Sequence, residues 1–483
     1  MTQLAGVAAR GTAVTVLMQV AKMLLQVGSV TVLGRLLLPE TFGLVAMVTA
    51  VIGVAELLRD FGLSLASMQS RQLTDAERSN LFWVNAGLGL LCAAAAWAVT
   101  PLIVAVYDEP TLSAVVPPLA GAFVLSGMTT QFRADLARRF RFGALAVTDI
   151  LGPAVGIAVA IVLAARGAEV EALVAQQLTA AAVTLVVAVV LAGWLPRWYR
   201  RDVPLGRFFR FGGHVLGAQL LDYVTRNADT VALGAVWGAA PLGVYTRGYQ
   251  LAVVPINQIN APLTKVAVPV LARVADDRAA LERGMRRAQL VGCYVTAPLL
   301  AVAGALAVPA VAILLGPGWD AVAPIFAVLA VGSSFRAISQ IAYWGFLATS
   351  STGALLRLQL WAQPLMVLLL LAGLPWGGVG VAVGYLVGSV GYWVASIAAF
   401  GRATRTPVRG LYATGARALV GVALPAAAAA HLVQRSVDGS VVAVLLGVAA
   451  AAATVALVAL VVRPVRRDLQ GLVRTALLLR RRG

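Results

Sequence analysis

The chain has 483 residues, of which 60% are hydrophobic and only 12% are charged, and its mean hydropathy is +0.88. A soluble protein of this length carries far more charge, so the composition predicts an integral membrane protein. Lys and Arg total 38 against 20 Asp and Glu, which gives a net charge of +18. The basic residues do not form one patch, and this argues against nucleic acid as a partner.

Apolar stretches of about 20 residues recur along the chain, and each is long enough to cross a hydrocarbon core of about 30 Å. We therefore expect an all-α integral membrane protein with about fourteen transmembrane helices. The expected spans are 12–34, 42–68, 81–105, 114–132, 144–165, 172–194, 214–237, 242–270, 289–315, 322–349, 354–374, 379–400, 415–432 and 441–462. Their even number places both termini on the same side of the membrane.

Arginines gather in every second loop. The loops on the side of the amino terminus hold most of them, whereas the opposite loops hold only Arg35, Arg166 and Arg435. Because cytoplasmic loops are enriched in basic residues, we expect both termini in the cytoplasm and the protein in the inner (plasma) membrane. The tail 464–483 has apolar residues at helical spacing among arginines, which predicts a basic amphipathic helix on the membrane lipids of the inner surface.

An internal repeat has an offset of 200 residues. Leu33-Gly34 and Gly43 correspond to Leu233-Gly234 and Gly243, and in the same register Lys22 corresponds to Asp222. Repeats flanking a central site are common in secondary transporters. We therefore expect two pseudo-symmetric six-helix lobes around a central cavity. The expected divisions are an N-lobe at 1–196, a C-lobe at 197–410, two appended helices at 411–463 and the tail at 464–483.

Signatures of enzymes are scarce. The sequence has no Gly-Lys-Ser or Gly-Lys-Thr, so a P-loop is not expected, and its two histidines, His214 and His431, cannot form an HExxH metal motif. Cys92 and Cys293 fall inside expected spans, so neither a disulfide nor a metal site is indicated. A membrane glycosyl polymerase or ligase is the alternative from a different class. Such an enzyme is expected to need a large outer loop, whereas the expected spans leave only short loops on the outer side. We expect a protein without cofactor or metal that is not an enzyme.

Charged side chains inside the spans are the strongest functional signal, because each costs at least about 2.5 kcal/mol at the centre of a lipid-facing helix. Basic residues outnumber acidic ones there, which favours a water-filled, anion-binding cavity. The candidate substrate-binding residues are Gln19, Lys22, Gln26, Arg59, Arg226, Arg247, Gln250, Asn257 and Arg336, and the candidates for ion coupling are Asp149, Asp222 and Asp229. The alternatives are structural ion pairs, such as Asp222 with Arg226, and side chains that extend to the interface.

Four segments resemble a known family: Gly34-Arg-Leu-Leu-Leu-Pro-Glu-Thr-Phe-Gly-Leu-Val-Ala-Met47, Glu56-Leu-Leu-Arg-Asp-Phe-Gly-Leu63, Leu81-Phe-Trp-Val-Asn85 and Arg138-Arg-Phe-Arg-Phe142. They are similar to the Wzx-like polysaccharide flippases of the multidrug/oligosaccharidyl-lipid/polysaccharide (MOP) exporter superfamily, notably its colanic and teichuronic acid exporter branch. This resemblance implies alternating access between two six-helix bundles.

The same resemblance implies a substrate. It is a lipid-linked oligosaccharide, carried on undecaprenyl diphosphate from the inner to the outer leaflet. The transported oligosaccharide serves polysaccharide or lipopolysaccharide biosynthesis, and a polysaccharide polymerase is a candidate partner. A diphosphate needs cationic partners, and sugars need a water-filled passage through lipid. The substrate implied by the resemblance therefore agrees with the charged residues inside the expected spans. A lipid II flippase and a multidrug exporter of the same superfamily stay open as alternatives. The sequence leaves open which glycan is carried and whether transport is coupled to H+, to Na+ or only to the membrane potential.

Overall fold

The computed structural model describes residues 2–60, 63, 67, 73–203 and 205–482, and in these residues it contains helices and turns without strands. Over its described residues, each expected span coincides with a helix or with a run of consecutive helices. Ten of the described segments are long and apolar enough to cross a membrane, and one of them, Thr352–Thr404, holds two long helices. The expected all-α membrane fold is confirmed.

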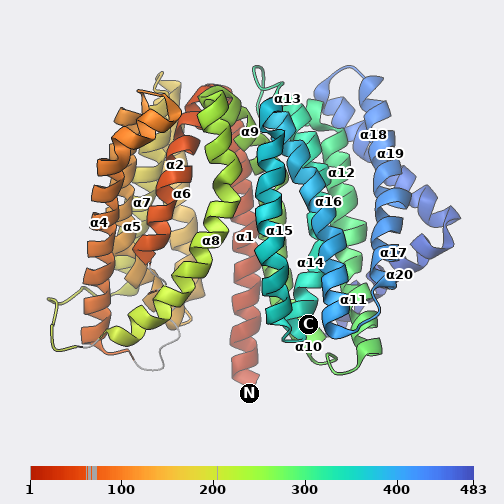
Figure 1. Ribbon diagram of the computed structural model, residues 1–483, viewed down its shortest axis with the longest axis horizontal. Helices are drawn as coiled ribbons and strands as arrows, with labels where there is room; N and C mark the ends of the chain where they lie inside the picture. Colours follow the sequence, from red (N-terminus) through yellow and green to blue (C-terminus); the bar gives the residue numbers. More distant parts are fainter. Residues whose placement is uncertain (1, 61–62, 64–66, 68–72, 204, 483) are drawn as a thin grey trace. The chain divides into compact units, whose positions relative to one another are not determined.

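The chain forms two compact units, and the first comprises Met1–Gly243. Within it α2 packs on α4, α5, α7 and α8, and α1 packs on α6 (Figure 1). Its helices are α1 (Thr2–Leu36), α2 (Pro39–Asp60), α4 (Asp75–Tyr107), α5 (Leu112–Arg138), α6 (Phe142–Ala165), α7 (Val170–Ala192) and α8 (Gly206–Trp237).

The second unit comprises Val244–Gly483. The α9 helix (Ala239–Ala252) leads into it from the first unit. Its other elements are α10 (Val254–Ala272), α11 (Arg278–Val291), the π-helix η1 (Gly292–Thr296), α12 (Ala297–Ala305), α13 (Ala307–Leu314), α14 (Val322–Ala348), α15 (Thr352–Gly373), the 3-10 turn η2 (Leu374–Trp376), α16 (Gly377–Thr404), α17 (Arg409–Ala418), the π-helix η3 (Leu419–Ala423), α18 (Leu424–Arg435), α19 (Ser440–Val461) and α20 (Arg463–Arg482).

Local sequence explains where the long helices begin and how closely they pack. Thr74 caps α4 through a capping box, in which its hydroxyl accepts from the Glu77 amide and the Glu77 carboxylate accepts from the Thr74 amide. Between α4 and α5, a Cβ at Gly89 would lie 2.6 Å from the Phe123 carbonyl oxygen. Small residues at such crossings let backbones approach, which is how helices associate in lipid.

The repeated glycines pack reciprocally. A Cβ at Gly43 would overlap the carbonyl oxygen of Ala239, and a Cβ at Gly243 would overlap the carbonyl oxygen of Pro39. The start of α2 therefore lies directly against the start of α9, and only glycine permits this approach at either position. The two glycines that mark the 200-residue repeat in the sequence have equivalent surroundings.

The connection between α7 and α8 is fixed to α4. The Asn80 side-chain amide donates to the Arg200 carbonyl at 2.6 Å and accepts from the Arg200 amide at 2.8 Å. One turn along, the Trp83 indole donates to the Arg197 carbonyl at 2.8 Å, and its ring stacks on Trp198. These contacts tie the connection to the first unit on its way to α8.

The expected division into lobes at 1–196 and 197–410 follows the repeat, whereas the compact units divide at Gly243. The difference concerns α8, which packs on α2 within the first unit. Packing of this kind does not test a division based on internal repetition, so the lobe boundaries stay a prediction.

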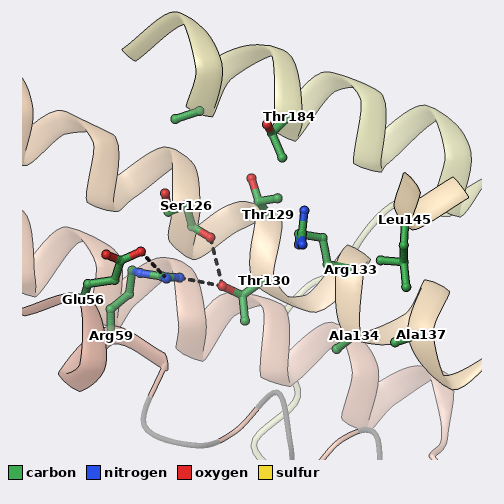
Figure 2. Close-up of a pocket in the computed structure, with 11 residues that line it drawn as sticks. Glu56, Arg59, Ser126, Thr129, Thr130, Arg133, Ala134, Ala137, Leu145 and Thr184 are labelled. Carbon is green, nitrogen blue, oxygen red and sulfur yellow. Dashed lines mark hydrogen bonds and ion pairs between the residues drawn. The ribbon is translucent and has the colours of Figure 1, made fainter. Parts of the chain in front are cut away.

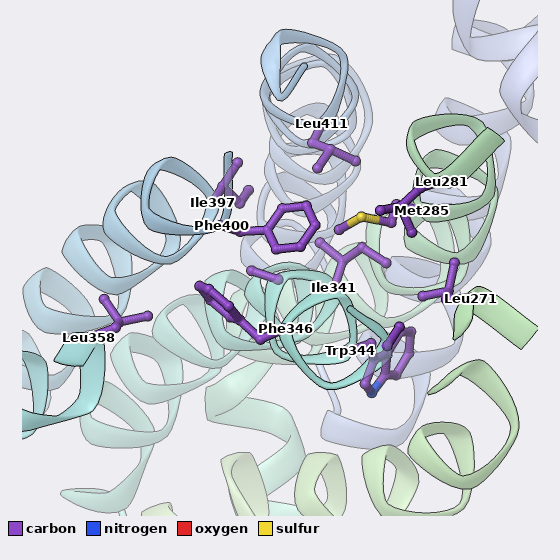
Figure 3. Close-up of a cluster of buried hydrophobic side chains, with 12 residues drawn as sticks. Leu271, Leu281, Met285, Ile341, Trp344, Phe346, Leu358, Ile397, Phe400 and Leu411 are labelled. Atoms are coloured by element: carbon purple, nitrogen blue, oxygen red, sulfur yellow. The ribbon is translucent and has the colours of Figure 1, made fainter. Parts of the chain in front are cut away.

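The core of the second unit is aromatic and aliphatic (Figure 3). The rings of Phe346 on α14 and Phe400 on α16 meet edge to face at 5.5 Å, with Met285 and Ile341 in the same buried cluster. The first turns of α20 also pack on this unit. There, Val465 is fully buried, and the carboxylate of Asp468 accepts from the Tyr294 hydroxyl at 2.7 Å and pairs with Arg417 at 3.0 Å.

Candidate functional site

A cavity of about 490 Å³ lies within the first unit, between α2, α5, α6 and α7 (Figure 2). The α2 helix supplies Glu56 and Arg59, while α5 contributes a row of hydroxyls and one further cation. The lining residues are Glu56, Arg59, Ser126, Thr129, Thr130, Arg133, Ala134, Ala137, Leu145, Ala181 and Thr184. A cavity with these side chains offers positive charge and hydrogen-bonding groups within helices that are otherwise apolar.

Arg59 is held in position at one end of this cavity. The residue is only 8% exposed, and its guanidinium donates to the Thr130 hydroxyl at 2.6 Å and lies 3.7 Å from the Glu56 carboxylate. The buried Nε–H has no acceptor among the described residues. A buried guanidinium with donor capacity left over is suited to bind an anionic oxygen.

A three-way ion pair lies beside Arg59. The two carboxylate oxygens of Asp149 on α6 each accept from a different cation, Lys22 of α1 at 2.6 Å and Arg133 of α5 at 2.6 Å. Arg133 also donates to the Thr148 hydroxyl at 3.3 Å and lines the cavity. Asp149 thus joins three helices, and Lys22 meets a residue 127 positions away.

The charges of this site do not cancel. Lys22, Arg59 and Arg133 carry three positive charges, whereas Glu56 and Asp149 carry two negative ones. One formal positive charge is therefore left among the named side chains. An anion that enters the cavity gains from this excess, and it also meets the hydroxyls of α5.

Two residues of this part of the structure were missed by sequence reasoning. Arg133 follows directly on the expected span 114–132, but α5 continues to Arg138 and keeps its side chain beside Thr130. The spacing of Thr129, Thr130 and Arg133 on one helical face is the signal that could have identified it. Asp135 was also missed. It is 1% exposed and lies between Arg78 at 3.6 Å and Arg139 at 3.0 Å.

The other candidates of the first unit lie on α1 and α8. Gln19 and Gln26 are half-buried on α1, and Arg226 is exposed on α8. Asp229 is 5% exposed, and its carboxylate accepts from the Thr230 amide at 2.7 Å. The side chain of Asp222 lies outside the described residues, so the pairing of Asp222 with Arg226 is not tested.

The remaining candidates belong to the second unit. The guanidinium of Arg247 donates to the Gln250 side chain at 2.6 Å, while the side chain of Asn257 lies outside the described residues. Arg336 lies over the ring of Tyr392, 4.9 Å from its centre. Among the side chains that the structure describes, no group of three His, Cys, Asp or Glu could hold a metal ion.

Comparisons with known proteins agree with the resemblance seen in the sequence. A family described as polysaccharide biosynthesis protein matches residues 32–324. The chain is 24% identical over 364 residues to the lipopolysaccharide biosynthesis protein WzxC of Escherichia coli K12, covering 74% of this chain and 73% of that protein. It is 26% identical over 286 residues to the teichuronic acid biosynthesis protein TuaB of Bacillus subtilis 168, covering 59% of each.

The fold has a counterpart among solved structures. The lipid II flippase MurJ in its inward closed conformation matches with a TM-score of 0.69, over 92% of this chain and 98% of that one, at 11% sequence identity. The identity is too low to carry function, but the likeness confirms the fold expected of the superfamily. Since the family match spans more than half of the sequence, the chain, a multi-pass membrane protein, belongs to the polysaccharide biosynthesis protein family.

Proposed function

We propose that the protein is a flippase that carries an oligosaccharide, linked to undecaprenyl diphosphate, from the inner to the outer leaflet of the inner membrane by alternating access. The observation that carries this proposal is the cavity of the first unit, where buried and half-buried cations lie beside hydroxyls within apolar helices. The names of the two relatives, which refer to lipopolysaccharide and teichuronic acid biosynthesis, support a role in polysaccharide synthesis.

The physical need for such a cavity follows from the cargo. An uncompensated hydroxyl costs several kcal/mol in hydrocarbon, roughly 4–8 kcal/mol on transfer from water to an alkane, so a multi-sugar head cannot cross unaided. A volume of about 490 Å³ lies within the usual range for small-ligand sites, roughly 300–1,000 Å³. It is large enough for a diphosphate and the sugar next to it, while the prenyl chain stays in lipid.

Arg59 and Arg133 are the proposed diphosphate ligands. Both line the cavity, and both are already oriented by a threonine hydroxyl, Thr130 for Arg59 and Thr148 for Arg133. Orientation before binding reduces the entropy lost when the ligand arrives. Two guanidinium groups match the geometry of phosphate oxygens, which accept pairs of parallel hydrogen bonds.

Asp149 is the proposed resting counter-ion of this site. In the absence of substrate its carboxylate satisfies Lys22 and Arg133, and an entering phosphate competes for the same two cations. Once they turn to the phosphate, the carboxylate loses both partners, and a proton or a metal cation could then neutralise it. Ion coupling through Asp149 is therefore part of the proposal, and Asp222 and Asp229 stay candidates for the same role.

The remaining polar candidates are proposed to line the path of the sugars rather than to hold the diphosphate. They are Gln19, Gln26, Arg226, Arg247, Gln250, Asn257 and Arg336. The proposed orientation, with cytoplasmic termini, follows from the distribution of arginines. In that orientation the membrane potential favours export of an anion by roughly 2.3 kcal/mol per charge per 100 mV. The proposed activity moves a substrate and makes or breaks no bond.

A lipid II flippase is the second candidate, because the fold match covers nearly the whole of MurJ. Both functions need a cationic site for a diphosphate, so the cavity does not separate them. They differ in the head group, which in one case is the repeat unit of a polysaccharide and in the other a peptidoglycan precursor. Restored growth of a strain depleted of its lipid II flippase, on expression of this protein, would favour the second candidate.

The proposal is tested by transport in proteoliposomes that contain the purified protein. The probe is a fluorescent oligosaccharide on undecaprenyl diphosphate, and its arrival in the opposite leaflet is measured by access to a membrane-impermeant quencher. Loss of one charged hydrogen bond costs about 1.5–3 kcal/mol, so Arg59→Gln and Arg133→Gln should each slow transport by about 10- to 100-fold at equal protein level.

The matched control is Arg166→Gln, which removes an exposed arginine of the same unit at the carboxyl end of α6. It should transport like the wild type. If the two cavity variants transport as fast as this control, the cavity is not the diphosphate site. If the wild-type protein itself moves no probe, the flippase assignment fails.

A further inference from the structure

Among the described residues, Arg336 has no carboxylate close by, unlike the three cations at the cavity of the first unit, Lys22, Arg59 and Arg133. It lies near the middle of α14, in a segment apolar enough to span the membrane. Among the described residues no carboxylate lies within 4.0 Å of its guanidinium, which lies over the ring of Tyr392 on α16, 4.9 Å from the ring centre. A charge in such a helix costs about 2.5–3.5 kcal/mol, and a cation–π contact offsets only about 0.5–2 kcal/mol of it.

Two glutamines extend this contact onto a third helix. The side-chain amide of Gln359 on α15 donates to the Tyr392 hydroxyl at 3.3 Å, and the side-chain amide of Gln363 donates to the side-chain oxygen of Gln359 at 2.9 Å. The α16 helix packs on both α14 and α15. We call Arg336, Gln359, Gln363 and Tyr392 the polar seam of the second unit. All four are half-buried, so the seam retains access to molecules outside the helix packing.

The chemistry of the seam is that of an anionic sugar site. A guanidinium that lies over an aromatic ring keeps its in-plane N–H groups available, and these match the two oxygens of a carboxylate. Primary amides both donate and accept, as sugar hydroxyls do. In the first unit each cation near the cavity has a carboxylate within 4.0 Å. Among the described residues no carboxylate supplies a negative charge to Arg336, so a ligand can supply it.

We propose that the polar seam binds a carboxylate on the glycan, such as that of a uronic acid, and so selects acidic oligosaccharides over neutral ones. The inference rests on the proposed transport of an oligosaccharide, and it adds the class of glycan. Arg336 binds the carboxylate, while Gln359 and Gln363 bind hydroxyls of the same or the next sugar. The lipid diphosphate is the other possible source of an anion, and the experiment separates the two.

The test uses the purified full-length protein and three soluble probes: trigalacturonate, the neutral trisaccharide maltotriose and pyrophosphate. Binding is measured by the ligand-induced rise in melting temperature and by the fluorescence of the tryptophans, which include Trp393 beside the seam. Wild type should bind trigalacturonate at least about tenfold more tightly than maltotriose, as expected for one charged hydrogen-bonded contact. In Arg336→Gln this ratio should fall to about one, and the response to pyrophosphate should be unchanged.

Two further variants keep the proposal open to refutation if Arg336→Gln does not fold. Gln359→Glu places a carboxylate in the seam with almost no change of shape, so it should lower the affinity for trigalacturonate and leave that for maltotriose unchanged. Arg357→Gln is the control, because Arg357 is an exposed arginine on the same helix as Gln359. It should behave like the wild type.

The outcomes separate this inference from the proposed function. If the ratio of the affinities for trigalacturonate and maltotriose is the same in wild type, Arg336→Gln and Gln359→Glu, the seam does not bind a carboxylate and the inference is overturned. If Arg336→Gln abolishes the pyrophosphate response instead, the seam binds the diphosphate and the inference is equally overturned. If pyrophosphate binds nowhere while the ratio still depends on Arg336, the seam is confirmed and the proposed diphosphate site fails.

Discussion

Replacing Asp149 by Asn removes the charge that Lys22 and Arg133 share, and it keeps the size of the side chain. At 2.6 Å and an effective dielectric constant of 20, each pair attracts by about 6 kcal/mol before desolvation is subtracted. Desolvation offsets most of this, and the three side chains are between 21% and 38% exposed. We therefore expect a net loss of about 1–3 kcal/mol, between the values for exposed and for buried pairs.

The thermal stability of the purified protein measures this loss. Asp149→Asn should lower the melting temperature by several degrees, since about 1 kcal/mol corresponds to roughly 2–4 °C in domains of a few hundred residues. Lys22→Met with Asp149→Asn should regain part of it, because only Arg133 is then left without its partner. Asp202→Asn is the control. It breaks an ion pair of similar length with Arg200, but that pair is exposed to solvent, so its loss should leave the melting temperature nearly unchanged.

The same variant tests the role of Asp149 as a resting counter-ion. Without the carboxylate both cations are free to bind phosphate oxygens, so pyrophosphate should stabilise Asp149→Asn more than it stabilises the wild type. A melting temperature equal to that of the wild type would show that the three-way pair contributes no stability. An unchanged or smaller response to pyrophosphate would refute the idea that Asp149 competes with phosphate for Lys22 and Arg133.

Three further predictions concern the frame around the sites. Asn80→Ala removes both hydrogen bonds to Arg200 and should cost about 1–3 kcal/mol, seen as faster tryptic cleavage of the connection between α7 and α8. Equal cleavage rates would show that these hydrogen bonds do not hold the connection against α4. Asp468→Ala leaves Arg417 without its carboxylate and should speed amide hydrogen exchange in α20, whereas unchanged exchange would mean that apolar contacts alone hold this helix. Phe400→Ala empties a fully buried position and should lower the unfolding free energy by about 3–5 kcal/mol in denaturant titrations; a loss below about 1 kcal/mol would show that the core collapses around the gap.

The sequence was sufficient for the helices and for most of the charged residues inside them, because hydropathy and spacing are local properties. It did not reveal which of these residues meet. Lys22 and Asp149 were both identified, but in different roles, and nothing in the spacing of either helix indicates that α1 packs on α6. Arg133 was assigned to a loop because the apolar stretch ends before it, whereas the helix does not. Contacts between distant helices depend on packing, which a single sequence does not specify.

The reciprocal packing of Gly43 and Gly243 has the form of a two-fold contact. Gly43 meets Ala239, which corresponds to Pro39 in the repeat, and Gly243 meets Pro39 itself. A symmetric homodimer has the same kind of contact. Residue i of one subunit contacts residue j of the other, and residue j of the first subunit contacts residue i of the second. The two segments therefore associate as two copies of one half-length chain would. A larger side chain at either glycine would separate the same pair of backbones, so the two positions are constrained together.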